Sequence, residues 1–149
     1  MTIRLAENSD LVLIARLRWD FKSADGDVAV LSRSEFEKKC AEKLRAESEQ
    51  WAHFLAFENQ TAIGMVSICR VPKILSPDLK SDSVGYLTNT YVEADFRNKQ
   101  VGQQLLEFAR NWANENNFEL LIVWPSDRSR SFYRRLGFNE DNEIMELLF

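Results

Sequence analysis

The sequence predicts an α+β fold built around one mixed β-sheet. Segments with the period-two alternation of strands are interleaved with segments whose apolar residues recur every three or four positions, as on helices. The 149 residues are 45% hydrophobic and 28% charged, which is typical of one globular domain with a substantial core. The predicted order is strand, two helices, strands, helix, strand, helix and strand, in a single domain over residues 1–149.

The first half of the chain contains three predicted strands and two predicted helices. The strands cover residues 2–6, 51–57 and 61–71, and the helices run from residue 11 to about 21 and from the cap at 32–35 through 46. Asn8, Ser9 and Asp10 are typical capping residues in front of the first helix. Gly64, inside the third strand, indicates a bulge or a close backbone approach.

The second half begins with a predicted surface loop at residues 72–83 and a strand at residues 86–92. A helix then opens at residues 100–103, and its apolar face comprises Val101, Leu105, Phe108, Ala109 and Trp112. An apolar run at residues 118–124 predicts another strand, and a short helix follows with Phe132, Tyr133 and Leu136. A last strand is predicted at residues 143–149.

Composition excludes several classes of partner. A net charge of -4 and a pI near 5.1 argue against nucleic acid and against anionic membranes, which bind basic surfaces. No apolar run approaches the length that spans a bilayer, and the first residues lack the apolar core of a signal peptide. Two cysteines and one histidine do not suggest a metal site. A reduced cytoplasmic protein is therefore expected.

A strand, a basic turn and a helix follow one another at residues 86–102, and this arrangement can hold a phosphate group. The first amides of a helix have no partner within the helix, and the helix dipole is positive there. Arg97 and Lys99 place cationic side chains at the same end, where acidic residues are otherwise favoured. Taken alone, the segment is equally consistent with an ordinary connection that carries two solvated charges.

A second motif, Ser-Phe-Tyr-Arg-Arg-Leu-Gly-Phe at residues 131–138, favours phosphate binding over an ordinary connection. The two motifs, in this order and with one apolar strand between them, resemble the GNAT superfamily of acyl-CoA-dependent N-acetyltransferases. The resemblance spans about residues 86–138. It implies a mostly antiparallel sheet of six to seven strands flanked by about four helices. It also implies that the sheet is splayed between the strand ending at Val92 and the strand ending at Trp124, which opens a cleft for acetyl-CoA.

The resemblance implies roles for individual residues. Tyr133 corresponds to the general acid that protonates the departing coenzyme A thiolate; packing against Phe132 or Trp124, with its hydroxyl on a carbonyl, is the structural alternative. Ser126 would contact pantetheine or cap the short helix. Arg97 and Lys99 would add contacts to phosphate. The remaining coenzyme contacts would come from the edge of the central strand and from the amides at the helix start, at Thr90, Tyr91, Val92, Asn98, Lys99, Gln100, Val101, Gly102 and Gln103.

This chain departs from the motif at two positions. Gln100 stands where the family's first glycine is expected, and Asn98 follows the arginine, where glycine is also frequent. Asparagine tolerates the left-handed backbone conformation better than most residues. Gln100 is therefore expected either to take an ordinary helical conformation with its side chain outward or to crowd the pyrophosphate, which would weaken coenzyme binding.

The acceptor side is less well defined by the sequence. Trp19, Asp20 and the acidic segment at residues 25–27 resemble an aromatic and acidic wall that would suit a cationic amine, although surface solvation explains the same acids. Asn89, on the central strand, is a further candidate for substrate binding. No general base is identified. His53 is expected to be a hydrogen-bonded strand residue.

The predicted function is transfer of an acetyl group from acetyl-CoA to a primary amine of a small molecule by direct attack, releasing coenzyme A. The alternatives are acetylation of a protein or peptide N-terminus and a non-catalytic acyl-CoA-binding or sensing module. The acceptor is not identified. The apolar C-terminal residues 145–149 suit either a homodimer interface or an internal strand.

Overall fold

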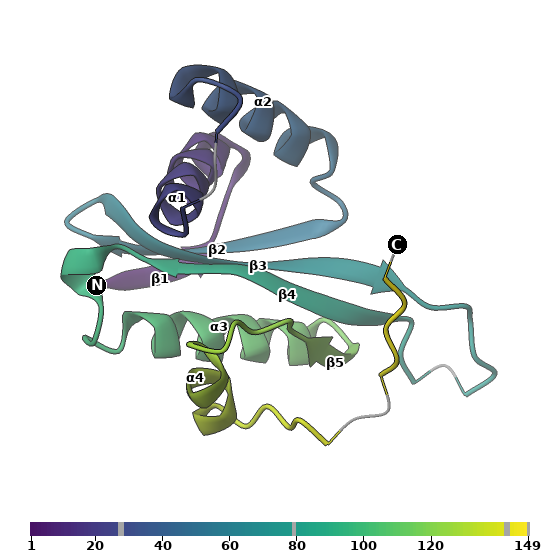
Figure 1. Ribbon diagram of the computed structural model, residues 1–149. Coiled ribbons are helices and arrows are strands. Elements are labelled where there is room, and N and C mark those ends of the chain that lie inside the picture. Colours follow the sequence, from purple (N-terminus) through teal and green to yellow (C-terminus); the bar gives the residue numbers. More distant parts are fainter. Residues whose placement is uncertain (27–28, 79, 142–143, 149) are drawn as a thin grey trace.

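Helices cover both faces of one β-sheet in the computed structural model, which describes residues 1–26, 29–78, 80–141 and 144–148 (Figure 1). Within these residues the sheet has five strands in the order β1-β2-β3-β4-β5. The strands are β1 Thr2–Leu5, β2 Trp51–Glu58, β3 Thr61–Pro72, β4 Ser83–Val92 and β5 Phe118–Ile122. The helices are α1 Leu11–Ala24, α2 Arg33–Ala46, α3 Val101–Glu115 and α4 Arg130–Arg135, with short 3-10 turns at Asn8–Asp10 and Ala94–Phe96.

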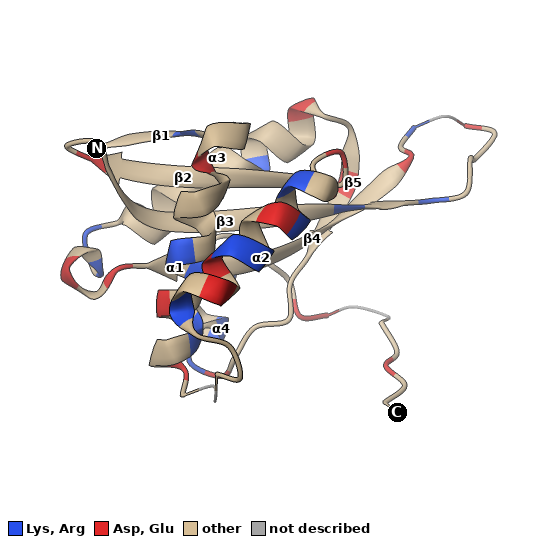
Figure 2. Cartoon of the chain, turned by 90° about the horizontal axis from the view of Figure 1, so that it is seen from above, with Lys and Arg blue, Asp and Glu red and all other residues tan. Residues whose placement is uncertain are grey.

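Two apolar layers hold the helices to the sheet. On one face, Ile14 and Leu17 of α1 and Ala41 of α2 lie in one apolar cluster with Leu55 of β2. On the other face, Leu105 of α3 packs in a layer with Phe54 and Leu87. Both faces of β2 and β3 are therefore buried, which explains why these strands carry almost continuous apolar sequence. The charged residues of α2 lie on the side that points away from the sheet (Figure 2).

The sheet is mostly antiparallel, and its one parallel pair opens partway along its length. β4 pairs with β5 at Ser83↔Phe118, Gly85↔Leu121 and Tyr86↔Ile122. β5 then ends, whereas β4 continues to Val92, and no strand among the described residues pairs with it on that edge. The predicted splay between these two strands is confirmed. The bulge expected at Gly64 is also confirmed, because the β2–β3 register shifts there and an added Cβ would lie 3.0 Å from the Tyr91 carbonyl oxygen.

The predicted final strand at residues 143–149 is wrong for the part of it that the structure describes. Residues 144–148 do not form a strand, and the described sheet has five strands and not six to seven. Glu143 and Phe149 lie outside the described residues. Alternation of apolar residues indicates which face a strand would bury, but it does not bring an edge within reach, and Met145 and Leu148 remain 95% and 80% exposed. The homodimer through this segment stays a prediction.

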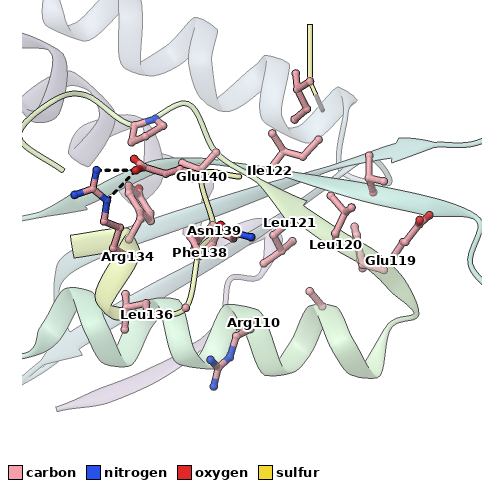
Figure 3. Close-up of a pocket in the computed structure, with 18 of the residues that line it drawn as sticks. Arg110, Glu119, Leu120, Leu121, Ile122, Arg134, Leu136, Phe138, Asn139 and Glu140 are labelled. Atoms are coloured by element: carbon pink, nitrogen blue, oxygen red, sulfur yellow. Dashed lines mark hydrogen bonds and ion pairs between the residues drawn. The ribbon is translucent and has the colours of Figure 1, made fainter. Parts of the chain in front are cut away.

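A cavity of about 880 Å³ lies beside β5 (Figure 3). Its walls come from β5, from α3 and from the segment after α4, where Arg134 pairs with Glu140 at 2.6 Å. It contains none of the predicted coenzyme-binding residues, although Tyr133 borders it. No helix in the described ranges combines the length and the apolarity needed to cross a bilayer.

Candidate active site

A cleft of about 1290 Å³ opens where β4 separates from β5. It is lined by α1, the second half of β4, the turn before α3, residues 123–126 and α4. Most of the predicted site residues meet in this cleft, namely Asn89, Thr90, Tyr91, Val92, Arg97, Asn98, Gln100, Val101, Gly102, Gln103, Ser126 and Tyr133. Lys99, Trp19 and Asp20 are not among the side chains that line it.

A bulge in β4 shapes the wall of the cleft. Asn89 has φ 58°, in the left-handed region, and the β3–β4 register shifts beside it, between the pairs Met65↔Tyr91 and Ser67↔Thr88. The extra residue turns Thr90 and Val92 toward the α3 and α4 side, while Tyr91 stacks on Phe21 of α1 with 5.5 Å between ring centroids. The unpaired edge of β4 therefore presents its backbone to the cleft.

The N-terminus of α3 forms one end of the cleft and is open to an anion. Its first helical hydrogen bond is donated by the Gln104 amide to the Gln100 carbonyl, at 3.0 Å. Among the described residues, no side chain caps this end and no acidic residue lies in its first turn. The amides of Val101, Gly102 and Gln103 are thus available for a phosphate group. These features fit a coenzyme diphosphate.

The turn before α3 keeps glycine-type geometry without glycine. Asn98 has φ 59° and Gln100 has φ 64°. The expectation of an ordinary helical conformation for Gln100 is wrong. This residue stands just outside the helix as its N-cap, and the turn that aims the following amides at the cleft requires the left-handed backbone even though the residue has a Cβ.

Replacing Gln100 with glycine should therefore stabilise the protein and tighten coenzyme binding. The left-handed conformation costs a residue with a Cβ about 1–2 kcal/mol, and the greater freedom of glycine in the unfolded chain offsets part of this gain. We expect a net gain of about 0.5–1 kcal/mol in unfolding free energy, measured by urea denaturation. Asn98→Gly is the matched control and should gain less, because asparagine tolerates this conformation. A lower unfolding free energy in Gln100→Gly would contradict the inference that the left-handed conformation of Gln100 is strained.

Two basic residues lie near this turn in different ways. The Arg97 Nε donates to the Val92 carbonyl at 3.0 Å, and its guanidinium lies 5.8 Å from the centroid of Tyr91. Arg97 therefore borders the cleft where β4 ends. The ammonium of Lys99 lies 5.3 Å from the centroid of Phe96, which lines the cleft, but Lys99 itself is not part of the lining.

Tyr133 reaches the cleft from α4. Its side chain is 7% exposed, and its ring packs edge-on against Phe132 and Phe138. Its hydroxyl donates to Thr90 Oγ1 at 3.1 Å and not to a carbonyl. Burial raises the pKa of this phenol above its ordinary value, so that it remains protonated at neutral pH. Trp124, the other predicted packing partner, instead packs on Tyr86 at 4.8 Å.

Ser126 lies in the cleft at the entrance to α4. Its hydroxyl is 3.1 Å from the Ser129 hydroxyl, and its backbone carbonyl accepts from the amides of Ser129 and Arg130. The backbone carbonyl of Ser126, and not its side chain, thus accepts the hydrogen bonds from the amides at the start of α4. The hydroxyl stays at the cleft surface.

The chain was compared with protein families, and the model of the acetyltransferase (GNAT) family matches residues 14–138. The chain belongs to the GNAT family. Both sequence motifs and the splayed sheet lie within the matched range. The predictions of an acyltransferase and of acetyl-CoA as its coenzyme are confirmed at the level of the family.

One N-acetyltransferase is similar to this chain in sequence, and two acetyltransferases of solved structure share its fold. An uncharacterized N-acetyltransferase, YhfO, from Bacillus subtilis (strain 168) is 27% identical over 95% of this chain and 91% of its own length. A predicted acetyltransferase with acetyl-CoA from Clostridium acetobutylicum superposes with a TM-score of 0.81 at 22% identity, covering 99% of this chain and 95% of that one. A ribosomal-protein-alanine N-acetyltransferase from Brucella melitensis biovar Abortus 2308 has a TM-score of 0.76 at 18% identity, covering all of both chains.

The acceptor side of this GNAT cleft differs from the wall expected from sequence. Trp19 packs on Phe36 of α2 at 5.6 Å, and the Asp20 carboxylate pairs with Arg33 at 3.1 Å. Asp25 borders the cleft but pairs with Arg128 at 3.0 Å. Asp27 lies outside the described residues. The structure therefore does not bring Trp19 or Asp20 to the cleft.

Arg18 and Phe21 occupy the cleft in their place, and sequence reasoning did not select them. Residues three and four apart share a helix face, so Arg18, Phe21 and Lys22 form one stripe, whereas Trp19 lies about 100° around the helix from Arg18. The signal that could have found them was the phase of α1, once its apolar stripe at Ile14 and Leu17 was assigned to the core.

A chain of hydrogen bonds runs from Arg18 through the three neighbouring strands β4, β3 and β2. An Arg18 Nη1 donates to Asn89 Oδ1 at 3.2 Å, and Asn89 Nδ2 donates to Ser67 Oγ at 3.3 Å. The Ser67 hydroxyl lies 2.8 Å from His53 Nδ1, and it donates to that nitrogen in the neutral tautomer whose proton is on Nε2. The prediction that His53 is a hydrogen-bonded strand residue is confirmed. Its Nε2 has no hydrogen-bond partner within the described part of the chain.

His53 should make stability depend on pH below neutrality. Burial lowers its pKa from 6.5 to about 4. Between these values the unfolded chain binds a proton that the folded chain excludes, so stability falls as the pH decreases, by about 3 kcal/mol in all, and then levels off. Urea denaturation across this range measures the effect. His53→Gln, which does not titrate, should lose this part of the pH dependence. An unchanged pH slope in His53→Gln would contradict the assignment.

Proposed function

We propose that this acetyltransferase moves the acetyl group of acetyl-CoA directly onto a primary amine of a small molecule. One observation carries the proposal. The hydroxyl of Tyr133 is buried, protonated and hydrogen-bonded to Thr90 on the unpaired stretch of β4, in the same cleft as the open N-terminus of α3. This arrangement supports an anion site and a proton donor at two points along one groove.

The α3 amides and the open edge of β4 would bind different parts of acetyl-CoA. The amides of Val101, Gly102 and Gln103 would hold the diphosphate, with Arg97 adding a charge-assisted contact. The open edge of β4 at Tyr91 or Val92 would place a backbone N–H against the acyl oxygen, and such preorganised donors are often the largest single catalytic effect. When bound, acetyl-CoA supplies the thioester that the amine attacks.

Tyr133 would complete the exchange of bonds. As the carbon–nitrogen bond forms and the carbon–sulfur bond breaks, the phenol gives its proton to the departing thiolate and the amine loses a proton to solvent. The phenolate then regains a proton from solvent. Thiols and phenols have pKa values close enough that this transfer is only modestly uphill. A cytoplasmic location is proposed with this activity, in keeping with the free cysteines Cys40 and Cys69.

The test is thiol release from acetyl-CoA across a panel of amines, combined with calorimetric titration of acetyl-CoA into the purified protein. An enzyme binds the coenzyme and releases thiol with at least one small amine. A sensing module would bind the coenzyme and release none with any acceptor, and a peptide acetyltransferase would respond only to peptides with a free N-terminus. Either of these two results would overturn the proposal.

A further inference from the structure

Arg18 is a cation on the acceptor side of the cleft whose charge no carboxylate neutralises within the described residues. Its neighbour on the same helix shows the contrast. Arg16 pairs with Glu93 at 3.2 Å and donates to the Ala62 carbonyl at 2.6 Å. Arg18 makes one hydrogen bond, to the neutral Asn89 amide, and its guanidinium lies 5.6 Å from the centroid of Phe21. Most of its five N–H donors are left for a ligand.

The position of Arg18 is prepared by the strands behind it. Asn89 can accept from Arg18 because its own NH2 group is engaged by Ser67, which in turn is 2.8 Å from His53. Arginine is never an acceptor, so this chain holds the Asn89 oxygen toward the guanidinium. The part-buried cation is thereby preorganised, which reduces the entropy that binding a ligand would cost.

Arg18 and the general acid approach β4 at consecutive residues. Arg18 contacts Asn89 from α1, and Tyr133 contacts Thr90 from α4. β4 ends at Val92, three residues beyond Asn89, and the anion-binding amides of α3 follow only after the turn that comes next. Arg18 therefore stands beside the point of reaction, on the side opposite Tyr133, and not at the diphosphate end.

The charges around the cleft have one dominant sign. Its described lining contains Arg18, Lys22, Arg97, Arg128 and Arg135 against a single acid, Asp25, which is already paired with Arg128. This surplus of basic groups contrasts with the net charge of -4 for the whole chain. Such a lining disfavours an acceptor with a second cationic group, and it favours one that brings a negative charge.

We propose that Arg18 binds a carboxylate of the acceptor, so that the substrate is a primary amine that also carries a carboxylate group. The planar guanidinium matches the two oxygens of a carboxylate. The inference that this ligand is an acceptor rests on the proposed acetyl transfer. Binding of a carboxylate at Arg18 is tested separately, by affinity as well as by turnover.

The test uses pairs of acceptors that differ in one group. The probes are L-amino acids and unbranched ω-amino acids of increasing length, each with its carboxamide, together with putrescine and O-phosphoethanolamine. Thiol release is measured with acetyl-CoA, and binding of the same probes to the coenzyme A complex is measured by calorimetry. We expect at least one carboxylate to exceed its carboxamide about ten- to a hundredfold in kcat/KM and in affinity, the range typical of a hydrogen bond to a charged group.

Three variants separate this site from a general disturbance. Arg18→Gln should abolish the preference by raising KM for the carboxylate, while the carboxamide and acetyl-CoA bind as before. Arg18→Lys should retain part of the preference, since it keeps the charge without the planar fork. Arg16→Gln should retain all of it. Thermal unfolding of each variant checks that it folds.

The outcomes are distinct. If no amine releases thiol, the proposed acetyl transfer is wrong. The carboxylate site is then decided by binding alone: it requires that a carboxylate bind more tightly than its carboxamide and that Arg18→Gln remove the difference. Equal use of carboxylates and carboxamides, or a preference for putrescine, would overturn the site. A preference for O-phosphoethanolamine over every carboxylate would also overturn it, in favour of a phosphate-bearing amine.

Discussion

Replacing Tyr133 with phenylalanine should lower thiol release from acetyl-CoA about 10²- to 10⁴-fold, the usual contribution of a positioned general acid. The variant removes the one hydroxyl that reaches the unpaired stretch of β4 from α4 and leaves the ring packed against Phe132 and Phe138. Coenzyme affinity should stay nearly constant, because the anion-binding amides lie on α3. Steady-state rates and calorimetric titration of acetyl-CoA measure the two quantities separately.

Tyr86→Phe is the matched control for this change. Tyr86 also lies near the cleft, but its hydroxyl is directed to Thr88 at 3.3 Å and its ring packs on Trp124. Turnover in Tyr86→Phe should stay close to that of the wild type. A second readout is the alkaline limb of the rate profile, which should fall as pH rises through the raised pKa of Tyr133 and should be absent in Tyr133→Phe. Unimpaired turnover in Tyr133→Phe would remove the acid role.

Replacing Gly102 with alanine should raise the melting temperature and weaken acetyl-CoA binding. An added Cβ would lie 3.6 Å from both Phe132 and Val92, which is ordinary contact, and alanine favours a helix by about 1 kcal/mol over glycine. The melting temperature should therefore rise. We expect the same methyl group to crowd a phosphate bound at the first amides of α3. Losing one charge-assisted hydrogen bond weakens acetyl-CoA binding by about 1.5–3 kcal/mol, or roughly ten- to a hundredfold in Kd.

Gln104→Ala provides the control for helix propensity. Gln104 is exposed, lies two residues further along α3 and does not border the cleft. Its replacement should change the melting temperature slightly and leave the Kd for acetyl-CoA as it is. Calorimetry and thermal unfolding of the two variants are compared with the wild type. If Gly102→Ala became more stable and bound acetyl-CoA as tightly as before, the diphosphate would have to sit elsewhere.

The sequence alone was sufficient for features that depend on neighbouring residues. The alternation at residues 86–92 and the apolar stripe from Val101 to Trp112 predicted β4 and α3, because both patterns reflect the local period of one element. The order of the two motifs predicted the family and the splayed sheet. Asn98 was rightly suspected of left-handed geometry, since the tolerance of asparagine for it is a property of the residue itself.

Only the tertiary structure decided which residues from distant segments face each other. Gln100 takes a left-handed conformation that its own preference opposes, because the surrounding turn and α3 require it. Packing of Ile14 and Leu17 into the core sets the rotation of α1, and this rotation carries Arg18 into the cleft and Asp20 to Arg33. The contacts from Asn89 to Ser67 and from Ser67 to His53 join residues 22 and 14 positions apart. Residues 144–148 have the alternation of a strand but do not form one. Periodicity describes one segment at a time, whereas pairing and side-chain direction depend on the free energy of the whole packed chain.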